Sequence, residues 1–272
     1  MSGFSEEVHL RNKVSRAFGS ARNASPEKRR EVSGELLKCL QSNYQSVRTA
    51  ASRQLALLFK HMGEMQEQAI DTILDLCEDP ETSVRMIGYK LLMDTARREP
   101  AWAPRNTDVL VQLLQNEDPL ELQTIQNSLF EIIKDLPAKS LPILVEYLVG
   151  DGAEHTTELR DHVITFLTGR SSHEIIPILL QDGAGAQLIE GLVKVLSGAS
   201  ATNAQLIVDK LLHPFFRERP HPKLAHNAVR SILHNVESPR RNSDGEVQQL
   251  DGDQLVASCF PRTFPYLEIE YQ

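Results

Sequence analysis

A repeating pattern of apolar and polar residues runs through most of this chain. Four times, a hydrophobic residue followed by a polar one opens a helix-like segment, at Val47-Arg48, Val84-Arg85, Leu122-Gln123 and Leu159-Arg160. These four positions are separated by 37, 38 and 37 residues. A period of this length is typical of stacked helical repeats.

Each copy continues with apolar residues at helical spacing, and each is preceded by a second leucine-rich segment. In the second copy, Ile87, Leu91 and Leu92 follow Val84 at offsets that place them on one helix face. The preceding segments are residues 36–40, 70–77, 109–114 and 143–149. Short polar turns that contain Asp, Ser or Pro separate the two segments, and these residues favour helix starts. Each unit is therefore predicted to be a helical hairpin.

Stacking explains why such a hairpin is repeated, because one hairpin cannot bury its apolar face alone. We predict an all-α fold, a right-handed α-solenoid of HEAT-like helical hairpins that occupies residues 1–236 and offers an extended concave surface. After residue 167 the period loosens, and further helices are expected at 175–180, 188–196, 206–212 and 223–236. Residues 237–272 hold seven acidic residues against three arginines and are turn-rich, which predicts an acidic, disordered tail.

Charge and hydropathy narrow the function classes. The net charge of −8 argues against a nucleic-acid groove. No apolar run approaches the ~18 residues that a membrane helix needs, and the N-terminal residues have no secretory pattern, so we expect an intracellular protein without membrane contacts. Residues 1–30 nevertheless form a basic arm, which either reaches an acidic partner or simply faces water. Its basic residues are Arg11, Lys13, Arg16, Arg22, Lys28, Arg29 and Arg30.

A search for catalytic chemistry finds little. The cysteines Cys39, Cys77 and Cys259 are odd in number and far apart, which favours reduced thiols over a disulfide or a metal site. The nine histidines lack the spacing of a zinc-binding helix. The chain also has no phosphate-binding glycine fingerprint and no nucleophile elbow. We therefore expect no catalysis, no cofactor, no metal ion and no small-molecule ligand.

Two motifs within the repeats invite a functional interpretation. Arg48, Arg85 and Arg160 share one position in three repeats, and we predict that they are structural, each bridging to an acid in a neighbouring turn, as Asp79 is placed to do for Arg85. The second motif is Leu-x-x-Leu-Leu, formed by Leu110, Leu113 and Leu114. An exposed motif of this kind docks into hydrophobic grooves. The repeat register instead predicts that these leucines face the core.

The chain also resembles a known family. The segments that carry the likeness are Phe59-Lys60-His61, Ala69-Ile70, Leu74-Asp75-Leu76-Cys77-Glu78-Asp79 and Val84-Arg85. They resemble the N-terminal repeats of the apoptosis inhibitory protein 5 family, and the similarity covers about residues 6 to 170. The resemblance implies a non-enzymatic HEAT-repeat scaffold, mostly nuclear, that is associated with suppression of apoptosis. It also implies three partners: Acinus, a messenger-export RNA helicase and, in animals, a fibroblast growth factor.

Two function classes remain open at this point. The first is an adaptor that holds protein partners and regulates cell death or nuclear messenger processing, without direct contact to nucleic acid. The alternatives are a HEAT-like enzyme that acts on nucleic acid, which would need a basic concave face, or an adaptor that resembles a transport receptor. Family members are typically about twice as long as this chain and have a basic tail, whereas this chain ends in acidic residues.

Overall fold

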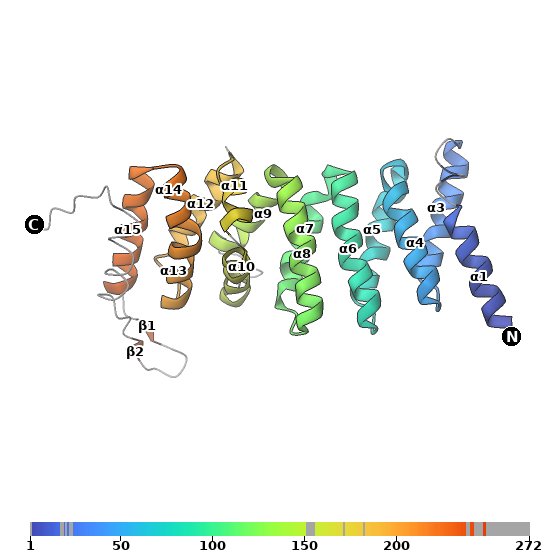
Figure 1. Cartoon of the computed structure of the whole chain (residues 1–272), viewed down its shortest axis with the longest axis horizontal. Coiled ribbons are helices and arrows are strands. Elements are labelled where there is room, and N and C mark those ends of the chain that lie inside the picture. The colour runs from blue at the N-terminus through green and yellow to red at the C-terminus, as the bar shows by residue number, and fades with distance from the viewer. Residues whose placement is uncertain are drawn as a thin grey trace, which may run out of the picture. The chain divides into compact units, whose positions relative to one another are not determined.

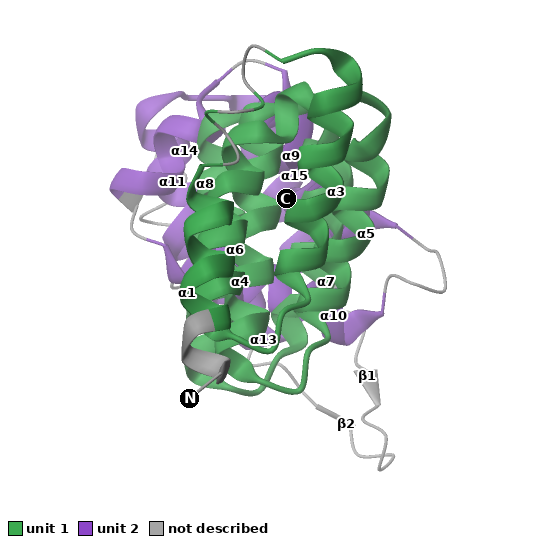
Figure 2. Ribbon diagram, turned by 90° about the vertical axis from the view of Figure 1, so that its right-hand side faces the viewer, with its two compact units in different colours: residues 1–136 green, residues 137–272 purple. Residues whose placement is uncertain are grey.

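The computed structural model describes residues 2–16, 19, 21, 24–150, 156–170, 172–181, 183–237, 240–241 and 247–248. The chain divides into two compact units, Met1–Leu136 and Pro137–Gln272, which Figure 2 colours separately. Helices dominate both units, so the predicted all-α fold is confirmed. The tail predicted for residues 237–272 lies outside the described residues except for Glu237 and two short strands. The limits of that tail and of the repeat domain stay predictions.

Unit 1 consists of helices that follow one another as antiparallel hairpins. Its helices are α1 (Ser2–Ser15), α3 (Pro26–Leu40), α4 (Gln45–Leu58), α5 (Gln66–Cys77), α6 (Thr82–Arg98), α7 (Ala103–Gln112) and α8 (Pro119–Asp135). Four 3₁₀ turns join or extend them: η1 (Phe59–His61), η2 (Gly63–Met65), η3 (Pro100–Trp102) and η4 (Leu113–Gln115). The hairpins predicted from the leucine-rich segments are therefore present.

The hairpins of unit 1 stack through equivalent helices. Helix α3 packs on α4, α5 on α6 and α7 on α8, and the second helices contact each other in the order α4, α6, α8 (Figure 1). Helix α1 packs against α4 at the start of this row. Such nearest-neighbour packing defines a solenoid, in which each repeat buries its apolar face against the next. The HEAT type and the right-handed sense of the solenoid stay predictions.

The structure corrects the register of the third repeat. Helices α4, α6, α8 and α10 (Thr157–Gly169) begin after the N-cap residues Tyr44, Glu81, Asp118 and Thr156, which are spaced by 37, 37 and 38 residues. The position of Val84 is thus taken by Glu121, not by Leu122 as the hydrophobic pattern predicted. That prediction was wrong because it placed an apolar residue at every buried position, whereas here a buried carboxylate is compensated by neighbouring donors.

Local sequence explains where these helices begin. The Asp118 carboxylate accepts hydrogen bonds from the backbone N–H groups of Leu120 and Glu121 at 2.9 and 3.0 Å, and Pro119 occupies the first turn of α8. Ser25 caps α3 in the same way, with Pro26 at its start. A side-chain oxygen at the N-cap satisfies backbone donors that have no partner within the helix, and proline costs nothing there.

The core of unit 1 depends on one close helix contact. A Cβ atom on Gly88 of α6 would lie 2.7 Å from the Cys77 Sγ and 3.0 Å from the Cys77 backbone nitrogen of α5. The first distance is shorter than Cβ contacts in proteins and the second is at their lower limit, so a side chain at this position would force the two helices to shift. The core of unit 1 also includes Ile73 of α5, Leu91 of α6 and Leu129 of α8, which are all buried.

Unit 2 is also helical. Its elements are α9 (Pro137–Val149), α10, α11 (Ser172–Leu179), α12 (Ala184–Val195), α13 (Ala201–Ile207), the π-helical turn η5 (Val208–Leu212), α14 (His213–Glu218), α15 (Pro222–Glu237), β1 (Arg240–Arg241) and β2 (Val247–Gln248). The helices expected after residue 167 are thereby confirmed. Helix α9 packs on α12 and on α10, α12 packs on α15, and β1 pairs with β2 in antiparallel sense. Within the described residues, every helix is too short or too polar to cross a membrane.

Candidate functional site

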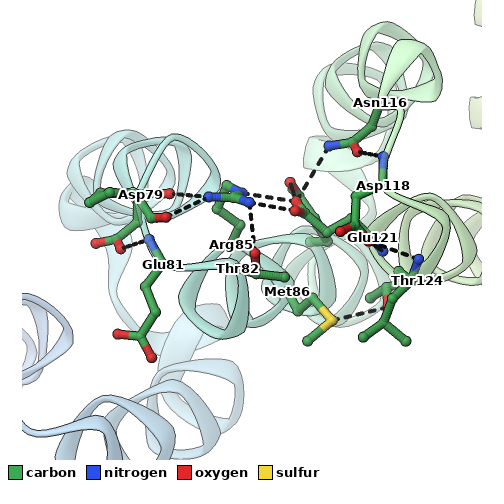
Figure 3. Close-up of polar contacts among 12 residues, drawn as sticks. Asp79, Glu81, Thr82, Arg85, Met86, Asn116, Asp118, Glu121 and Thr124 are labelled. Atoms are coloured by element: carbon green, nitrogen blue, oxygen red, sulfur yellow. Dashed lines mark hydrogen bonds and ion pairs between the residues drawn. The ribbon is translucent and has the colours of Figure 1, made fainter.

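The most elaborate polar cluster joins the second and third repeats of unit 1. Arg85 of α6 donates from Nε to Glu121 Oε2 of α8 at 2.9 Å, and its Nη2 donates to Glu121 Oε1 (Figure 3). The same guanidinium donates from Nη1 to the backbone carbonyl of Asp79 at 2.7 Å and from Nη2 to Thr82 Oγ1 at 2.9 Å. A two-pronged arginine–carboxylate pair fixes distance and angle together. Arg85 therefore orients α6, α8 and the turn before α6.

Glu121 is buried but well satisfied. Its carboxylate is 1% exposed and accepts further hydrogen bonds from Tyr89 Oη at 2.7 Å and from Asn116 Nδ2 at 3.3 Å. The hydrogen bond from Arg85 is the largest influence on the Glu121 pKa and lowers it, while desolvation raises it. The hydrogen bond from Tyr89 adds to the lowering, so that the Glu121 pKa is about 2. Burial, together with the hydrogen bond to Glu121, raises the pKa of Tyr89. Glu121 therefore stays ionised at neutral pH, and its negative charge is paired with the positive charge of Arg85.

The expected pairing of Arg85 with the Asp79 side chain is wrong. The Asp79 carboxylate instead accepts the backbone N–H of Glu81 at 2.8 Å, two residues further along the same turn. Aspartate in a turn readily makes this local contact, which directs its carboxylate to the backbone of its own turn. Arg85 uses only the Asp79 backbone oxygen, and its acidic partner comes from the next repeat.

The other two arginines at this repeat position have different surroundings. Arg48 of α4 donates from Nη2 to Glu81 Oε2 at 2.9 Å and from Nη1 to the Ser42 carbonyl at 2.7 Å, so it too joins consecutive repeats. Glu81 is 53% exposed, unlike Glu121. Arg160 of α10 has a buried Nε without a hydrogen-bond partner among the described residues. Beside it, Asp161 accepts a 2.7 Å hydrogen bond from Asn203 Nδ2 of α13.

The basic arm is partly neutralised by its own unit. Three ion pairs form: Lys13 Nζ lies 2.9 Å from Glu35 Oε1, Lys28 Nζ lies 2.8 Å from Glu31 Oε2, and Arg30 Nη2 lies 3.3 Å from Glu64 Oε2. All six of these side chains are largely exposed, so the pairs are screened and weak. Of the remaining members, Arg11 and Arg16 are exposed, Arg29 is half-buried, and Arg22 lies outside the described residues.

The leucine motif has no exposed docking face. Leu110 in α7 is completely buried, Leu114 in η4 is 2% exposed and Leu113 is half-buried. Leucines in these positions pack within unit 1 and cannot enter the groove of another protein without local unfolding. The predicted burial is confirmed for Leu110 and Leu114, whereas Leu113 is only half-buried.

The residues with nucleophilic or metal-binding potential are dispersed. The Cys77 thiol is buried in α5, and desolvation raises its pKa to about 12. Desolvation also raises the pKa of Cys39, and Cys259 lies outside the described residues. In the part of the chain that the structure describes, no three His, Cys, Asp or Glu side chains come close enough to hold a metal ion.

Glu121 as the partner of Arg85, and Tyr89 as the second donor to Glu121, were not predicted from the sequence. The signal for Glu121 in the sequence is weak: a glutamate three residues after Asp118, the residue before the helix, and 36 residues beyond Arg85. Only an alignment of the repeats by their helix starts, rather than by hydrophobicity, would have placed that carboxylate against the preceding repeat.

Fold and polar contacts together define a helical-repeat protein whose neighbouring hairpins are joined by arginine–carboxylate pairs. A family model, Apoptosis inhibitory protein 5 (API5), matches residues 23–217. Because this match covers well over half of the 272 residues, the chain belongs to the apoptosis inhibitory protein 5 family, and the resemblance found in the sequence is confirmed.

Individual relatives match over shorter stretches. The chain is 36% identical over 124 residues to the Apoptosis inhibitor 5 homolog of Drosophila melanogaster, a stretch that covers 46% of this chain and 23% of that protein. It is 39% identical over 84 residues to the Apoptosis inhibitor 5 of Homo sapiens, which covers 31% of this chain and 16% of the human protein. The homolog of Dictyostelium discoideum is 28% identical over 97 residues, or 35% of this chain and 16% of the relative. The chain thus matches less than a quarter of the length of each of these relatives.

Proposed function

We propose that this protein is a non-enzymatic, protein-binding scaffold that acts as a negative regulator of apoptosis, as an adaptor for nuclear messenger-processing factors, or as both. The observation that carries the proposal is the Arg85–Glu121 cluster between two repeats of unit 1. It fixes the relation of consecutive hairpins through side chains, and stacked hairpins held in this way present an extended surface for other macromolecules.

The chemistry of the titratable groups supports a binding role over a catalytic one. Glu121 is saturated with hydrogen bonds from Arg85, Tyr89 and Asn116, and its low pKa makes it a poor general acid or base near neutral pH. The Cys77 thiol stays protonated far above neutral pH, so it is a poor nucleophile. Both perturbed groups thus behave as structural elements.

Family membership supports the biological role. The curated relatives are named apoptosis inhibitors, and we extend that role to this chain as a proposal. For the same reason we propose nuclear residence and partners from the set implied by the resemblance: an Acinus-like protein, a messenger-export RNA helicase and, in animals, a fibroblast growth factor. The N-terminal repeats would suffice for at least one of these contacts.

A direct binding experiment tests the proposal. The full chain is immobilised, and purified candidate partners from the same organism are passed over it in biolayer interferometry. We expect at least one candidate to bind with a dissociation constant of about 10 µM or tighter. The matched control is the Glu121→Ala variant, which disturbs the stacking of the repeats without changing an exposed residue.

A cellular assay tests the role in cell death. Cells that express the chain should show lower executioner caspase activity after a death stimulus than cells that express the Glu121→Ala variant at the same level. The proposal fails if no candidate partner binds and the chain leaves caspase activity unchanged at matched expression.

A further inference from the structure

A second surface feature lies wholly within unit 2, between helices α12 and α15. It is a pocket of about 760 Å³, which we call the α12–α15 pocket. Its lining residues are Glu190, Val193 and Lys194 of α12, His221 before α15, and Lys223, Leu224, Asn227, Arg230 and Ser231 of α15. On α15 these residues recur every three or four positions, so they form one stripe along the helix, while Ala225, Ala228, Val229 and Ile232 face the core.

The pocket carries an unbalanced positive charge. Lys194, Lys223 and Arg230 are exposed, and among the described residues none of the three forms an ion pair within 4 Å. Glu190 is the single acidic residue in the lining, which leaves an excess of two positive charges. In contrast, basic residues of unit 1 such as Arg97 and Arg105 each pair with two carboxylates. A cationic pocket stands out in a chain with a net charge of −8.

The beginning of α15 strengthens this positive potential. His221 accepts the backbone N–H groups of Leu224 at Nδ1, at 3.2 Å, and of Ala225 at its carbonyl oxygen, at 3.0 Å, and Lys223 and Leu224 of this first turn line the pocket. The N-terminal end of a helix carries partial positive charge and favours anions. The helix dipole and the lysine side chains therefore act in the same direction.

The lining favours a peptide over a nucleic acid. The half-buried Leu224, with the buried Val193 beneath it, provides an apolar contact that suits an aliphatic side chain. The lining has no Phe, Tyr or Trp to stack on a base, and its one imidazole, His221, accepts a hydrogen bond from the Leu224 backbone. Glu190 would repel a phosphate backbone, in which negative charges follow one another without a break. In a bound peptide the acidic side chains are separated by neutral residues, and one of these can lie beside Glu190. Peptide segments that alternate acidic and aliphatic residues meet both requirements.

We propose that the α12–α15 pocket binds an acidic peptide segment of a partner protein. Carboxylates of that segment pair with Lys194, Lys223 and Arg230, and one aliphatic side chain packs on Leu224, above Val193. The inference deepens the scaffold function proposed above and rests on it, because it specifies the chemistry of one partner segment. Electrostatic complementarity of this kind governs the choice of partner and the rate of association.

Fluorescence anisotropy of the full chain tests the pocket. The probe is a labelled peptide of about nine residues, with aspartates and glutamates around one central leucine. We expect binding that weakens as salt rises from about 0.05 to 0.3 M, because the paired charges are exposed and screened. Replacing the central leucine of the probe by serine should weaken binding several-fold, since the apolar contact is lost.

Two charge-reversal variants separate the pocket from general electrostatics. The double variant Lys194→Glu/Arg230→Glu should weaken binding about ten-fold or more. The matched control, Lys210→Glu/Arg217→Glu, makes the same change in net charge at exposed residues of unit 2 outside the pocket, and it should change binding less than two-fold. Circular dichroism and the midpoint of thermal unfolding establish that both variants are folded.

Each outcome decides the proposal. Equal losses in both variants, or equal affinity for a neutral peptide of the same length, would overturn it. A labelled oligouridine that binds more tightly than the peptide and responds to the pocket variant alone would assign the pocket to nucleic acid and also overturn it. Failure here leaves the scaffold proposal intact, because that proposal is tested separately with whole partner proteins.

Discussion

Replacing Glu121 by alanine tests the role of the buried carboxylate most directly. The substitution removes the acceptor of four hydrogen bonds, two from Arg85 and one each from Tyr89 and Asn116. Arg85 keeps its contacts to Asp79 and Thr82, but the Tyr89 hydroxyl loses its acceptor in a buried site. Loss of one partner costs about 3 to 5 kcal/mol in a fully buried pair, and because the Arg85 side chain is 23% exposed we expect about 2 to 4 kcal/mol in the free energy of unfolding.

The equivalent contact one repeat earlier provides the control. Glu81 accepts from Arg48 but is 53% exposed, so water replaces it when it is removed. We expect Glu81→Ala to cost about 1 kcal/mol. The difference between the two variants isolates burial as the cause, because both remove a carboxylate that joins an arginine to the next repeat.

The assay uses an internal reporter of unit 1. Trp102 in η3 is the only tryptophan of the chain, and its Nε1 donates to Gln66 Oε1 at 3.1 Å while its ring meets Phe59 edge-on. Its fluorescence during urea unfolding therefore follows unit 1, even if unit 2 unfolds separately. Equal losses for Glu121→Ala and Glu81→Ala would refute the reasoning.

The low pKa of Glu121 also sets a pH dependence. A carboxyl group with a folded-state pKa of about 2 and an ordinary value of 4.5 stabilises the fold above pH 4.5, and this stabilisation is lost as pH falls towards 2. Because the Arg85 side chain is partly open to solvent, we expect the ionised form of Glu121 to contribute about 1 to 2 kcal/mol to the free energy of unfolding. Urea unfolding at pH 5 and pH 3 should show a smaller decrease for Glu121→Ala than for the wild type.

Three further predictions concern packing and reactivity. Gly88→Ala should destabilise unit 1 by about 1 to 3 kcal/mol in urea unfolding. The control is Gly34→Ala in α3, which should not destabilise unit 1 because the new Cβ would meet only a methionine carbon at 3.9 Å. Equal effects of the two substitutions would contradict the close contact at Gly88. Leu129→Ala should cost about 2 to 5 kcal/mol, and a loss below about 0.5 kcal/mol would mean that its burial is misassigned. Cys77 should react with a thiol reagent at pH 8 only as fast as unit 1 opens, while the half-buried Cys39 should react faster; mass spectrometry of the labelled peptides distinguishes them.

Much of the fold was readable in the sequence because local rules dictate it. Apolar residues such as Leu91 and Leu129 recur at helical spacing, and Pro or Asp marks the helix starts, so the hairpins and the family resemblance followed from the printed residues. The burial of Leu110 and Leu114 followed from the same periodicity. These features depend on neighbours within about one helix, which the sequence states directly.

The polar contacts between repeats were less accessible. Arg85 was identified, but its partner was assigned to the nearby Asp79 instead of Glu121, which lies 36 residues away. Hydrophobic periodicity could not find Glu121, because it treats a buried position as apolar. Likewise, Lys194 on α12 and Arg230 on α15 look like ordinary surface residues until the packing of the two helices places them around one pocket.

The sequence by itself determined the helices, their pairing into hairpins and the family, since each depends on short-range periodicity and on helix-start residues. The tertiary structure decided which polar side chains meet across repeats. A carboxylate can occupy a core position only when donors from a neighbouring helix offset its desolvation, and the position of those donors is set by packing. For Glu121 these donors are the side chains of Arg85 and Tyr89.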